Sequence, residues 1–345
     1  MNYSDRMEVS PEDIFNQYFQ KYVGNMRPLF MPNDPASNDI VNYFSSLLRV
    51  LGLEDRGWDP HVESEALVND FHNLFSVDLP ADKFPEPEST HWRLGLLIYS
   101  HVVEMSAPYE ILLNLIRFKL NEGYSPNPYF KYLNTKEQKD FERYGIKTYR
   151  KIQIIKELAL RARLSIGEIF DDYYNADLRN AFNHSNYILT DEGFRARLDL
   201  SGMKTFTISY KALDKKLTCA KAFVAAFLYM HHQTRLAWGE RAGEGIPYDP
   251  HYKGLMEVLV DEEKLMCGFK VHWPNYSESY YQRKKDGIDM VNCCVSIPNA
   301  TLELMVGLYA RKPGKFSPLV EEGQEPRYTP LEISGDPARW PDDFV

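Results

Sequence analysis

The segment from Arg179 to His184, which reads RNAFNH, contains residue types that can act on a phosphate. Histidine takes up or releases a proton near neutral pH. Arginine stays cationic and presents a planar fork of donors, which suits the charge that develops on phosphoryl oxygens in a transition state. Asn180 and Asn183 can orient the histidine or the phosphate. These side chains predict metal-free cleavage of RNA, in which a ribose 2′-hydroxyl attacks its own phosphate.

The spacing of these residues has a consequence for the oligomeric state. On a continuous helix, Asn180, His184 and Tyr187 share one face, while Arg179 and Asn183 form a neighbouring pair. Arg179 and His184 lie about 140° apart around the helix axis, so a second copy of the helix would help to bring the two types together. Cleavage also needs a proton for the leaving 5′-oxygen, which a second histidine across a two-fold axis would supply. The geometry therefore favours a homodimer through the helical domain.

A structural role is the alternative for the same residues. An arginine and a histidine at this spacing occur in many proteins, and a histidine near a helix end is commonly capped or hydrogen-bonded. Arg179 and His184 would then only hold helices together. The protein would be a non-catalytic scaffold that binds nucleotides or proteins, or an antitoxin-like partner of a neighbouring nucleotidyltransferase.

Composition limits the class of protein. The 345 residues are 44% hydrophobic and 14% aromatic, which allows a sizeable core and two or three domains. The start lacks the pattern of a signal peptide, and the longest apolar runs are shorter than about 18 residues. The four cysteines show no CxxC spacing. We therefore expect a cytoplasmic protein without a membrane span.

The charge distribution restricts any nucleic-acid site to a local patch. The formal net charge of -9 argues against a protein that coats nucleic acid in general. Between Lys147 and Arg163, however, six cations stand against one acid, a local balance of +5. The weaker RNA-binding candidates on this segment are Lys147, Arg150, Lys151 and Arg161. A solvated helix face is the alternative interpretation.

The coarse pattern predicts a mainly α protein with a small hairpin and a C-terminal region that contains β-structure. We expect three regions: a helical region over 1–90, a helical domain over 91–240 and a β-rich region over 241–345 with an extended tail. Within the second region the pattern predicts a helical pair kinked near Pro108, an amphipathic helix over 147–163, a capping box at Ser165 and Glu168, and a hairpin near Gly193. Asn175 or Asp177 is an alternative helix cap.

Other polar groups fit no cofactor motif. His101 and Glu104 lie one helical turn apart but have no second half of a metal site, so hydrogen bonding is the better interpretation. The segment YSESYYQRKK reads either as a polar turn or as a site where tyrosines stack on bases. No Walker A, GxGxxG, GxSxG or HExxH pattern is present. We expect neither a metal nor an organic cofactor.

The motif RNAFNH, within DLRNAFNHSNYIL, closely resembles the signature of the HEPN superfamily, the higher eukaryote and prokaryote nucleotide-binding domains. The resemblance covers residues 91–240 and implies a helical bundle that dimerises with both motifs at the interface. It also implies a metal-independent endoribonuclease of toxin, abortive-infection or antiviral defence systems, with transfer RNA as one candidate substrate and a partner protein of such a system as a candidate partner.

The resemblance also assigns roles to individual residues. Arg179 and His184 would be the catalytic pair, Asn180 the polar residue that positions them, and Asn183 and Tyr187 supporting groups. Members of one subgroup carry a tyrosine two residues after the histidine, which a partner nucleotidylates. Asn186 occupies that position here, so we do not expect this mode of regulation.

Overall fold

The computed structural model describes most of the chain. The described residues are 11–31, 40–50, 60–75, 79–80, 82–198, 203–248, 253–274, 277–284, 287–296, 301–304, 309–312 and 315–318. The tail beyond residue 318, which we predicted to be extended, lies outside them.

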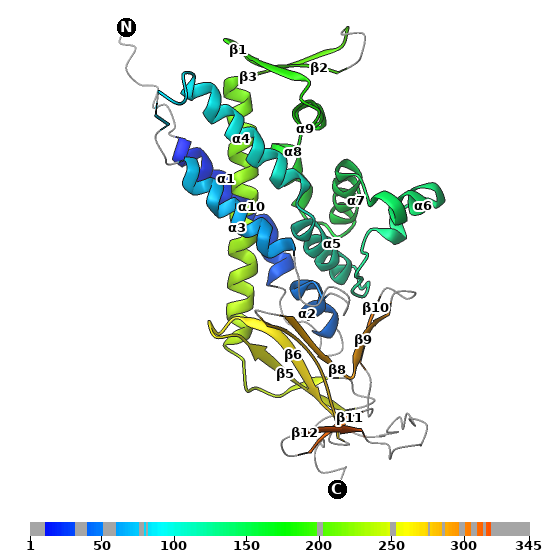
Figure 1. The fold of residues 1–345 in the computed structure, drawn as a ribbon. Coiled ribbons are helices and arrows are strands. Elements are labelled where there is room, and N and C mark those ends of the chain that lie inside the picture. Colours follow the sequence, from blue (N-terminus) through cyan, green and yellow to red (C-terminus); the bar gives the residue numbers. More distant parts are fainter. Residues whose placement is uncertain are drawn as a thin grey trace. The chain divides into compact units, whose positions relative to one another are not determined.

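The protein is a mixed α+β protein, mainly helical up to about residue 240 with one small sheet over 187–209, and built of strands after it (Figure 1). The helices are α1 (Pro11–Phe30), α2 (Ile40–Leu48), α3 (Pro60–Phe75), α4 (Pro87–Glu104), α5 (Ala107–Lys119), the 3-10 helix η3 (Phe130–Tyr132), α6 (Thr135–Tyr144), α7 (Thr148–Arg161), α8 (Ile166–Tyr173), α9 (Ala176–Asn183) and α10 (Tyr210–Gly239). The predicted change from helices to strands is confirmed. None of the described helices combines the length and apolar composition that a membrane-spanning segment requires.

The chain forms two compact units, each built from three stretches of sequence. The first unit contains residues 1–28, 60–109 and 132–230, and the second contains residues 29–59, 110–131 and 231–345. We predicted three consecutive regions instead. The grouping differs because α1, α5 and α10 each contribute residues to both units.

The core of the first unit is rich in buried aromatic rings. Tyr173 and Phe223 stack with centroids 5.2 Å apart, and Phe170 lies 5.7 Å from Tyr109. The hydroxyl groups of Tyr109 and Tyr173 lie 2.8 Å apart, so these buried polar atoms are hydrogen-bonded. These rings hold α8, the helix that leads into the RNAFNH segment, against α5 and α10.

The helical pair that we predicted near Pro108 is present, but it is broken rather than kinked. α4 ends at Glu104 and α5 begins at Ala107. Pro108 thus lies in the first turn of α5. Backbone N–H groups in this turn have no acceptor within the helix, so the proline costs no helical hydrogen bond.

The predicted capping box at Ser165 and Glu168 is wrong in its chemistry. α8 does begin after Ser165, but the Ser165 side chain makes no capping hydrogen bond. A complete capping box instead opens α6, where the Asn134 side chain accepts from the N–H of Glu137 and the Glu137 side chain accepts from the N–H of Asn134.

A three-stranded antiparallel sheet follows α9. It consists of β1 (Tyr187–Thr190), β2 (Gly193–Arg197) and β3 (Thr205–Ser209), in that order. The predicted hairpin is confirmed, since Thr190 pairs with Gly193 across a two-residue turn. Gly193 has φ 145°, and a Cβ there would lie 2.2 Å from the carbonyl oxygen of Ile208, so only glycine fits.

The second unit is built on a five-stranded antiparallel sheet. Its strands follow the chain order β4 (Ile246–Tyr248), β5 (Gly254–Val260), β6 (Met266–His272), β7 (Glu278–Lys284) and β8 (Gly287–Val291). Phe44 of α2 packs against Trp238 of α10 and Phe269 of β6, with centroids 4.8 and 6.1 Å apart. β9 (Cys293–Ser296) pairs with β10 (Thr301–Leu304), and β11 (Tyr309–Lys312) pairs with β12 (Lys315–Pro318).

Strand β7 corrects the sequence interpretation of YSESYYQRKK as a polar turn. Ser279 and Tyr281 are fully buried, whereas Tyr280 and Gln282 between and after them are only partly covered. This alternation is that of a strand with one face in the core.

Candidate active site on helix α9

Helix α9 carries the RNAFNH residues and is anchored at its start. The side chain of Asn175 accepts a hydrogen bond from the N–H of Leu178 at 2.8 Å, which is the N-cap that we predicted as an alternative. The N–H of Asn175 in turn donates to the hydroxyl of Tyr99 on α4. Leu178 and Ala181 are buried and fix the helix against its neighbours.

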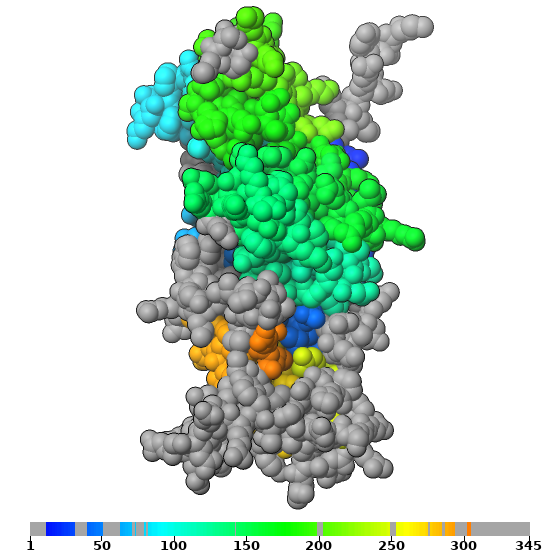
Figure 2. Space-filling model, turned by 90° about the vertical axis from the view of Figure 1, so that its right-hand side faces the viewer, coloured from blue at the N-terminus to red at the C-terminus, as the bar shows by residue number. Residues whose placement is uncertain are grey.

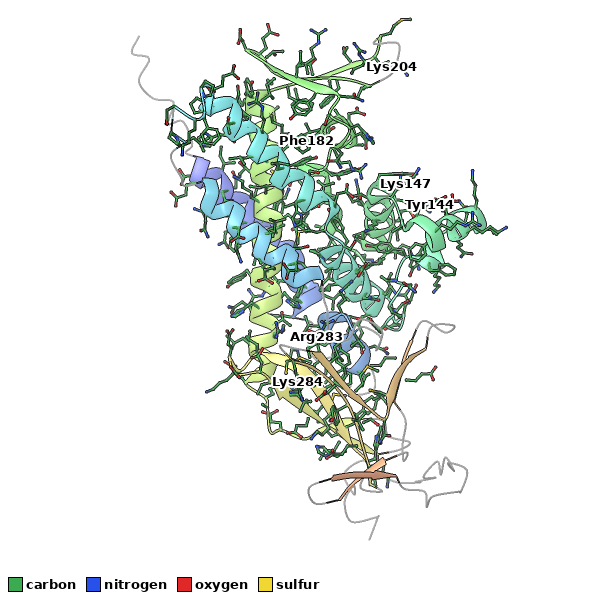
Figure 3. The ribbon with its side chains drawn as sticks, in the orientation of Figure 1. Tyr144, Lys147, Phe182, Lys204, Arg283 and Lys284 are labelled. Atoms are coloured by element: carbon green, nitrogen blue, oxygen red, sulfur yellow. The ribbon has the colours of Figure 1, made fainter. Side chains whose placement is uncertain are left out.

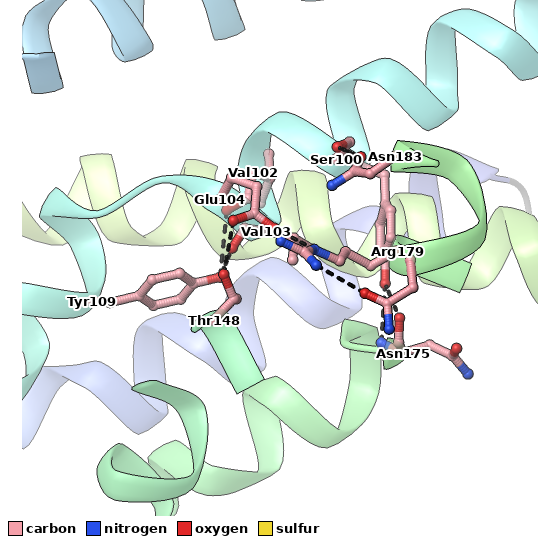
Figure 4. A network of polar contacts seen from close by, with 11 residues as sticks. Ser100, Val102, Val103, Glu104, Tyr109, Thr148, Asn175, Arg179 and Asn183 are labelled. Carbon is pink, nitrogen blue, oxygen red and sulfur yellow. Dashed lines mark hydrogen bonds and ion pairs between the residues drawn. The ribbon is translucent and has the colours of Figure 1, made fainter. Parts of the chain in front are cut away.

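A polar network fixes the side chain of Arg179 (Figure 4). Its Nε donates to Oε1 of Glu104 at 2.5 Å, and its Nη1 donates to Oδ1 of Asn180 at 2.8 Å. The other oxygen of Glu104 accepts from the hydroxyl of Thr148 at 2.8 Å. The guanidinium is therefore oriented from α4 and α7 as well as from its own helix.

The network leaves part of the guanidinium available. Arginine has five N–H donors, and the contacts with Glu104 and Asn180 use one on Nε and one on Nη1. Its side chain is 28% exposed. Three N–H groups thus remain to meet a phosphate.

His184 lies at the C-terminal end of the helix and is exposed. It is the C-cap residue, with φ -96° and ψ 5°. Its ring has no hydrogen-bond partner within the part of the chain that the structure describes. An exposed imidazole of this kind can exchange protons with a ligand.

The chain leaves the helix directly after His184. Ser185 takes the left-handed conformation with φ 55°. Its N–H donates to the carbonyl of Phe182, and the N–H of Asn186 donates to the carbonyl of Ala181, which is a Schellman motif. The expectation that Tyr187 continues a helical face with His184 is therefore wrong, because Tyr187 belongs to β1.

The remaining motif residues have separate contacts. The amide oxygen of Asn183 accepts from the hydroxyl of Ser100 at 2.5 Å, which links α9 to α4, and Asn180 is exposed beside Arg179. The ring of Tyr187 lies 4.9 Å from that of Phe194 and 5.5 Å from that of Phe182. Tyr187 thus supports the sheet by packing.

The four weaker RNA-binding candidates do not form one exposed surface. Lys151 is buried and donates to the Ser106 hydroxyl, and Arg150 pairs with Glu137 at 3.2 Å. Lys147 and Arg161 are exposed at opposite ends of α7. Only these two can meet a polyanion without breaking an internal contact.

Glu104 and Thr148 are site residues that the sequence did not assign to this cluster. The sequence presented Glu104 only as the partner of His101, and the described residues contain no group of three or more His, Cys, Asp and Glu side chains arranged to hold a metal. Glu104 lies 75 residues before Arg179 in the sequence, so its contact with the motif can be recognised only once the packing of α4 against α9 is known.

Burial also affects the titration of two groups near the network. Burial raises the pKa of Tyr174, while the charge of Arg179 acts in the opposite direction. Burial lowers the pKa of His101 below its ordinary value, although a hydrogen bond with the backbone of Ser64 partly opposes this. Tyr174 therefore remains a neutral phenol and His101 a neutral imidazole near pH 7.

Comparison with family models, with curated proteins and with solved structures gave no match to this chain. The resemblance to the HEPN superfamily rests on the motif residues and the order of elements around them.

Proposed function

We propose that the protein is a metal-independent endoribonuclease of HEPN type in a defence or toxin system. The ribose 2′-hydroxyl attacks the adjacent phosphate, and cleavage leaves 2′,3′-cyclic phosphate and 5′-hydroxyl ends. His184 moves the proton, Arg179 stabilises the charge on the phosphoryl oxygens, and Asn180 positions Arg179.

The observation that carries this proposal is the different environment of Arg179, in the middle of α9, and of His184, at its C-terminal end. Arg179 is oriented by two hydrogen bonds yet keeps free donors, while the His184 ring is exposed. A structural pair would bury both groups and satisfy them. An oriented cation beside an accessible proton carrier instead suits a group that must meet a ligand.

A second copy of the chain completes the proposed chemistry. One histidine can take the proton from the 2′-hydroxyl, but the leaving 5′-oxygen also needs a proton. Two copies of α9 across a two-fold axis would supply two imidazoles, and α9 lies on the face of the protein that Figure 2 shows. We therefore propose a homodimer through the first unit.

The proposal is tested with total RNA and transfer RNA in the presence of EDTA. Wild type should produce fragments with cyclic-phosphate and 5′-hydroxyl ends, and Arg179→Ala/His184→Ala should not. A matched control is Arg143→Ala/His232→Ala, which removes an exposed arginine and an exposed histidine elsewhere. Fragments of the same kind from the motif variant, or none from any protein, would reject catalysis at this motif.

A non-catalytic scaffold is the second candidate, and one observation favours it. The Arg179–Glu104–Thr148 chain joins three helices, which is what a purely structural arginine would do. In that case RNA would remain uncut by every variant, and Arg179→Ala would destabilise the fold.

A further inference from the structure

The sheet that follows α9 has two chemically different faces. Strand alternation places Tyr187, Phe194 and Phe206 on the inner face. The ring of Phe182, which Figure 3 labels, lies 5.5 Å from that of Tyr187 on this side. The residues between them point to the outer face. The inner face is thus part of the core, and the outer face is open.

The outer face presents donors that suit phosphate. Arg195 pairs with Thr207 and Arg197 pairs with Thr205 in the β2–β3 register, and all four residues are exposed. Among the residues that the structure describes, no acidic side chain forms an ion pair with Arg195 or Arg197. Two guanidinium groups beside two hydroxyls form a surface of hydrogen-bond donors with positive charge.

This cationic surface begins at the motif. The N–H of Arg197 donates to the carbonyl of Asn186 at 3.1 Å, and Asn186 follows His184 by two residues. Arg195 lies two residues from Arg197 on β2 and points to the same face, about 6–7 Å away by the rise of a strand. The acidic turn residues Asp191 and Glu192 are at the far end of the hairpin. An RNA strand that extends from His184 along the sheet would therefore contact Arg197 first and Arg195 next.

We propose that the outer face of β1–β3, centred on Arg195 and Arg197, binds the phosphodiester backbone of single-stranded RNA whose reacting phosphate lies at Arg179 and His184. This inference rests on the proposed function, because it extends the same site along its substrate. The contacts are with the backbone rather than with bases, since the described outer-face positions carry no aromatic ring for stacking.

A second copy of the chain fits this face less well than RNA does. An isologous two-fold contact centred on this face would bring the patch that carries Arg195 and Arg197 against the same positively charged patch of the other copy. Like charges that face one another repel, whereas phosphates neutralise them. Charge complementarity thus favours the polyanion.

Binding can be measured without cleavage by using a fluorescent 2′-O-methyl RNA, which lacks the attacking hydroxyl. We compare wild type with Arg195→Gln/Arg197→Gln and with the control Lys139→Gln/Arg143→Gln, which removes two exposed charges from α6. We expect the sheet variant to bind roughly tenfold more weakly at low salt. The slope of log K against log salt should fall by about 1.4, which corresponds to two lost phosphate contacts, and the α6 variant should match wild type.

Three outcomes would overturn the assignment. Equal binding by wild type and the sheet variant would show that the outer face does not hold RNA, and no binding by wild type would do the same. Sedimentation that shows a larger wild-type species, lost only in the sheet variant, would assign the face to contact between copies. The cleavage assays on the Arg179 and His184 variants test the proposed catalysis independently. Rejection of the sheet as a binding surface would therefore not reject catalysis at the motif.

Discussion

Nε of Arg179 lies 2.5 Å from Oε1 of Glu104, across 75 residues of sequence. The same carboxylate accepts from Thr148, so one glutamate joins α4, α7 and α9. Arg179 therefore has a fixed direction before any ligand arrives. This arrangement makes Glu104 a positioning residue for the proposed reaction.

The first prediction concerns that carboxylate. Glu104→Gln keeps the size of the side chain but removes the charge that holds the guanidinium. Because small misplacements of a catalytic group reduce rates strongly, we expect the cleavage rate at saturating RNA to fall at least about tenfold. The pair is partly exposed, so the free energy of unfolding should fall by about 1 kcal/mol or less.

Thr148→Val is the control for the Glu104 prediction. It removes the second hydrogen bond of Glu104 and keeps the ion pair with Arg179, at a site that is only 5% exposed. Its cleavage rate should fall less than that of Glu104→Gln. If Glu104→Gln and wild type cleave RNA at equal rates in single-turnover assays, Glu104 does not position Arg179 for the reaction.

The second prediction separates catalysis from structure at His184. The ring is exposed and has no partner among the described residues, so His184→Ala should change the free energy of unfolding by about 0.5 kcal/mol or less. RNA cleavage should nevertheless be lost. A cost of about 1–3 kcal/mol in urea denaturation would instead identify a satisfied structural histidine.

The sequence predicted the local features better than the contacts between distant segments. The hairpin at Gly193 and the cap at Asn175 followed from turn and cap chemistry, which acts over a few residues. The end of α9 was missed because a serine adopts the left-handed conformation there, where a glycine would have been the usual signal.

Contacts of long sequence separation left no readable pattern. In the sequence, nothing distinguishes Glu104 from the other acidic residues, because its contact with Arg179 depends on the packing of α4 against α9. Lys151 was predicted to lie on a basic face, but it is buried and donates to Ser106. Strand β7 could have been found from its alternation, but its polar composition concealed it. Burial of polar groups is decided by tertiary packing, and periodicity of apolar residues does not report it.

The third prediction uses the conformation of Ser185. Its φ of 55° costs an L-residue about 1–2 kcal/mol, which glycine avoids, although glycine loses more chain entropy on folding. Ser185→Gly should therefore stabilise the fold by about 0.5–1 kcal/mol. The matched control is Ser165→Gly, where φ is -85° and no strain is relieved. Stabilisation by both substitutions in thermal denaturation would contradict the argument from backbone strain.

The fourth prediction compares a formed capping box with one that exists only in sequence. Asn134→Ala removes two hydrogen bonds to the first turn of α6, so it should cost about 1 kcal/mol of folding stability. Ser165→Ala removes no capping bond, so it should cost less than about 0.5 kcal/mol. Hydrogen exchange at Lys136 and Glu137 reports the loss locally. Similar costs for the two alanines would show that the sequence pattern, rather than the hydrogen bond, determines stability.

The fifth prediction is a pH dependence that arises from His101. Burial lowers the pKa of its imidazole in the folded protein, so the unfolded chain binds the proton more readily. The stability that depends on neutral His101 is fully present above the ordinary pKa of about 6.5, and it is lost as the pH falls from there towards the lower folded value. His101→Gln cannot take up this proton. Urea denaturation between pH 8 and pH 5 should therefore show wild type losing stability relative to His101→Gln as the pH falls, and parallel curves for the two proteins would contradict the role of burial at this residue.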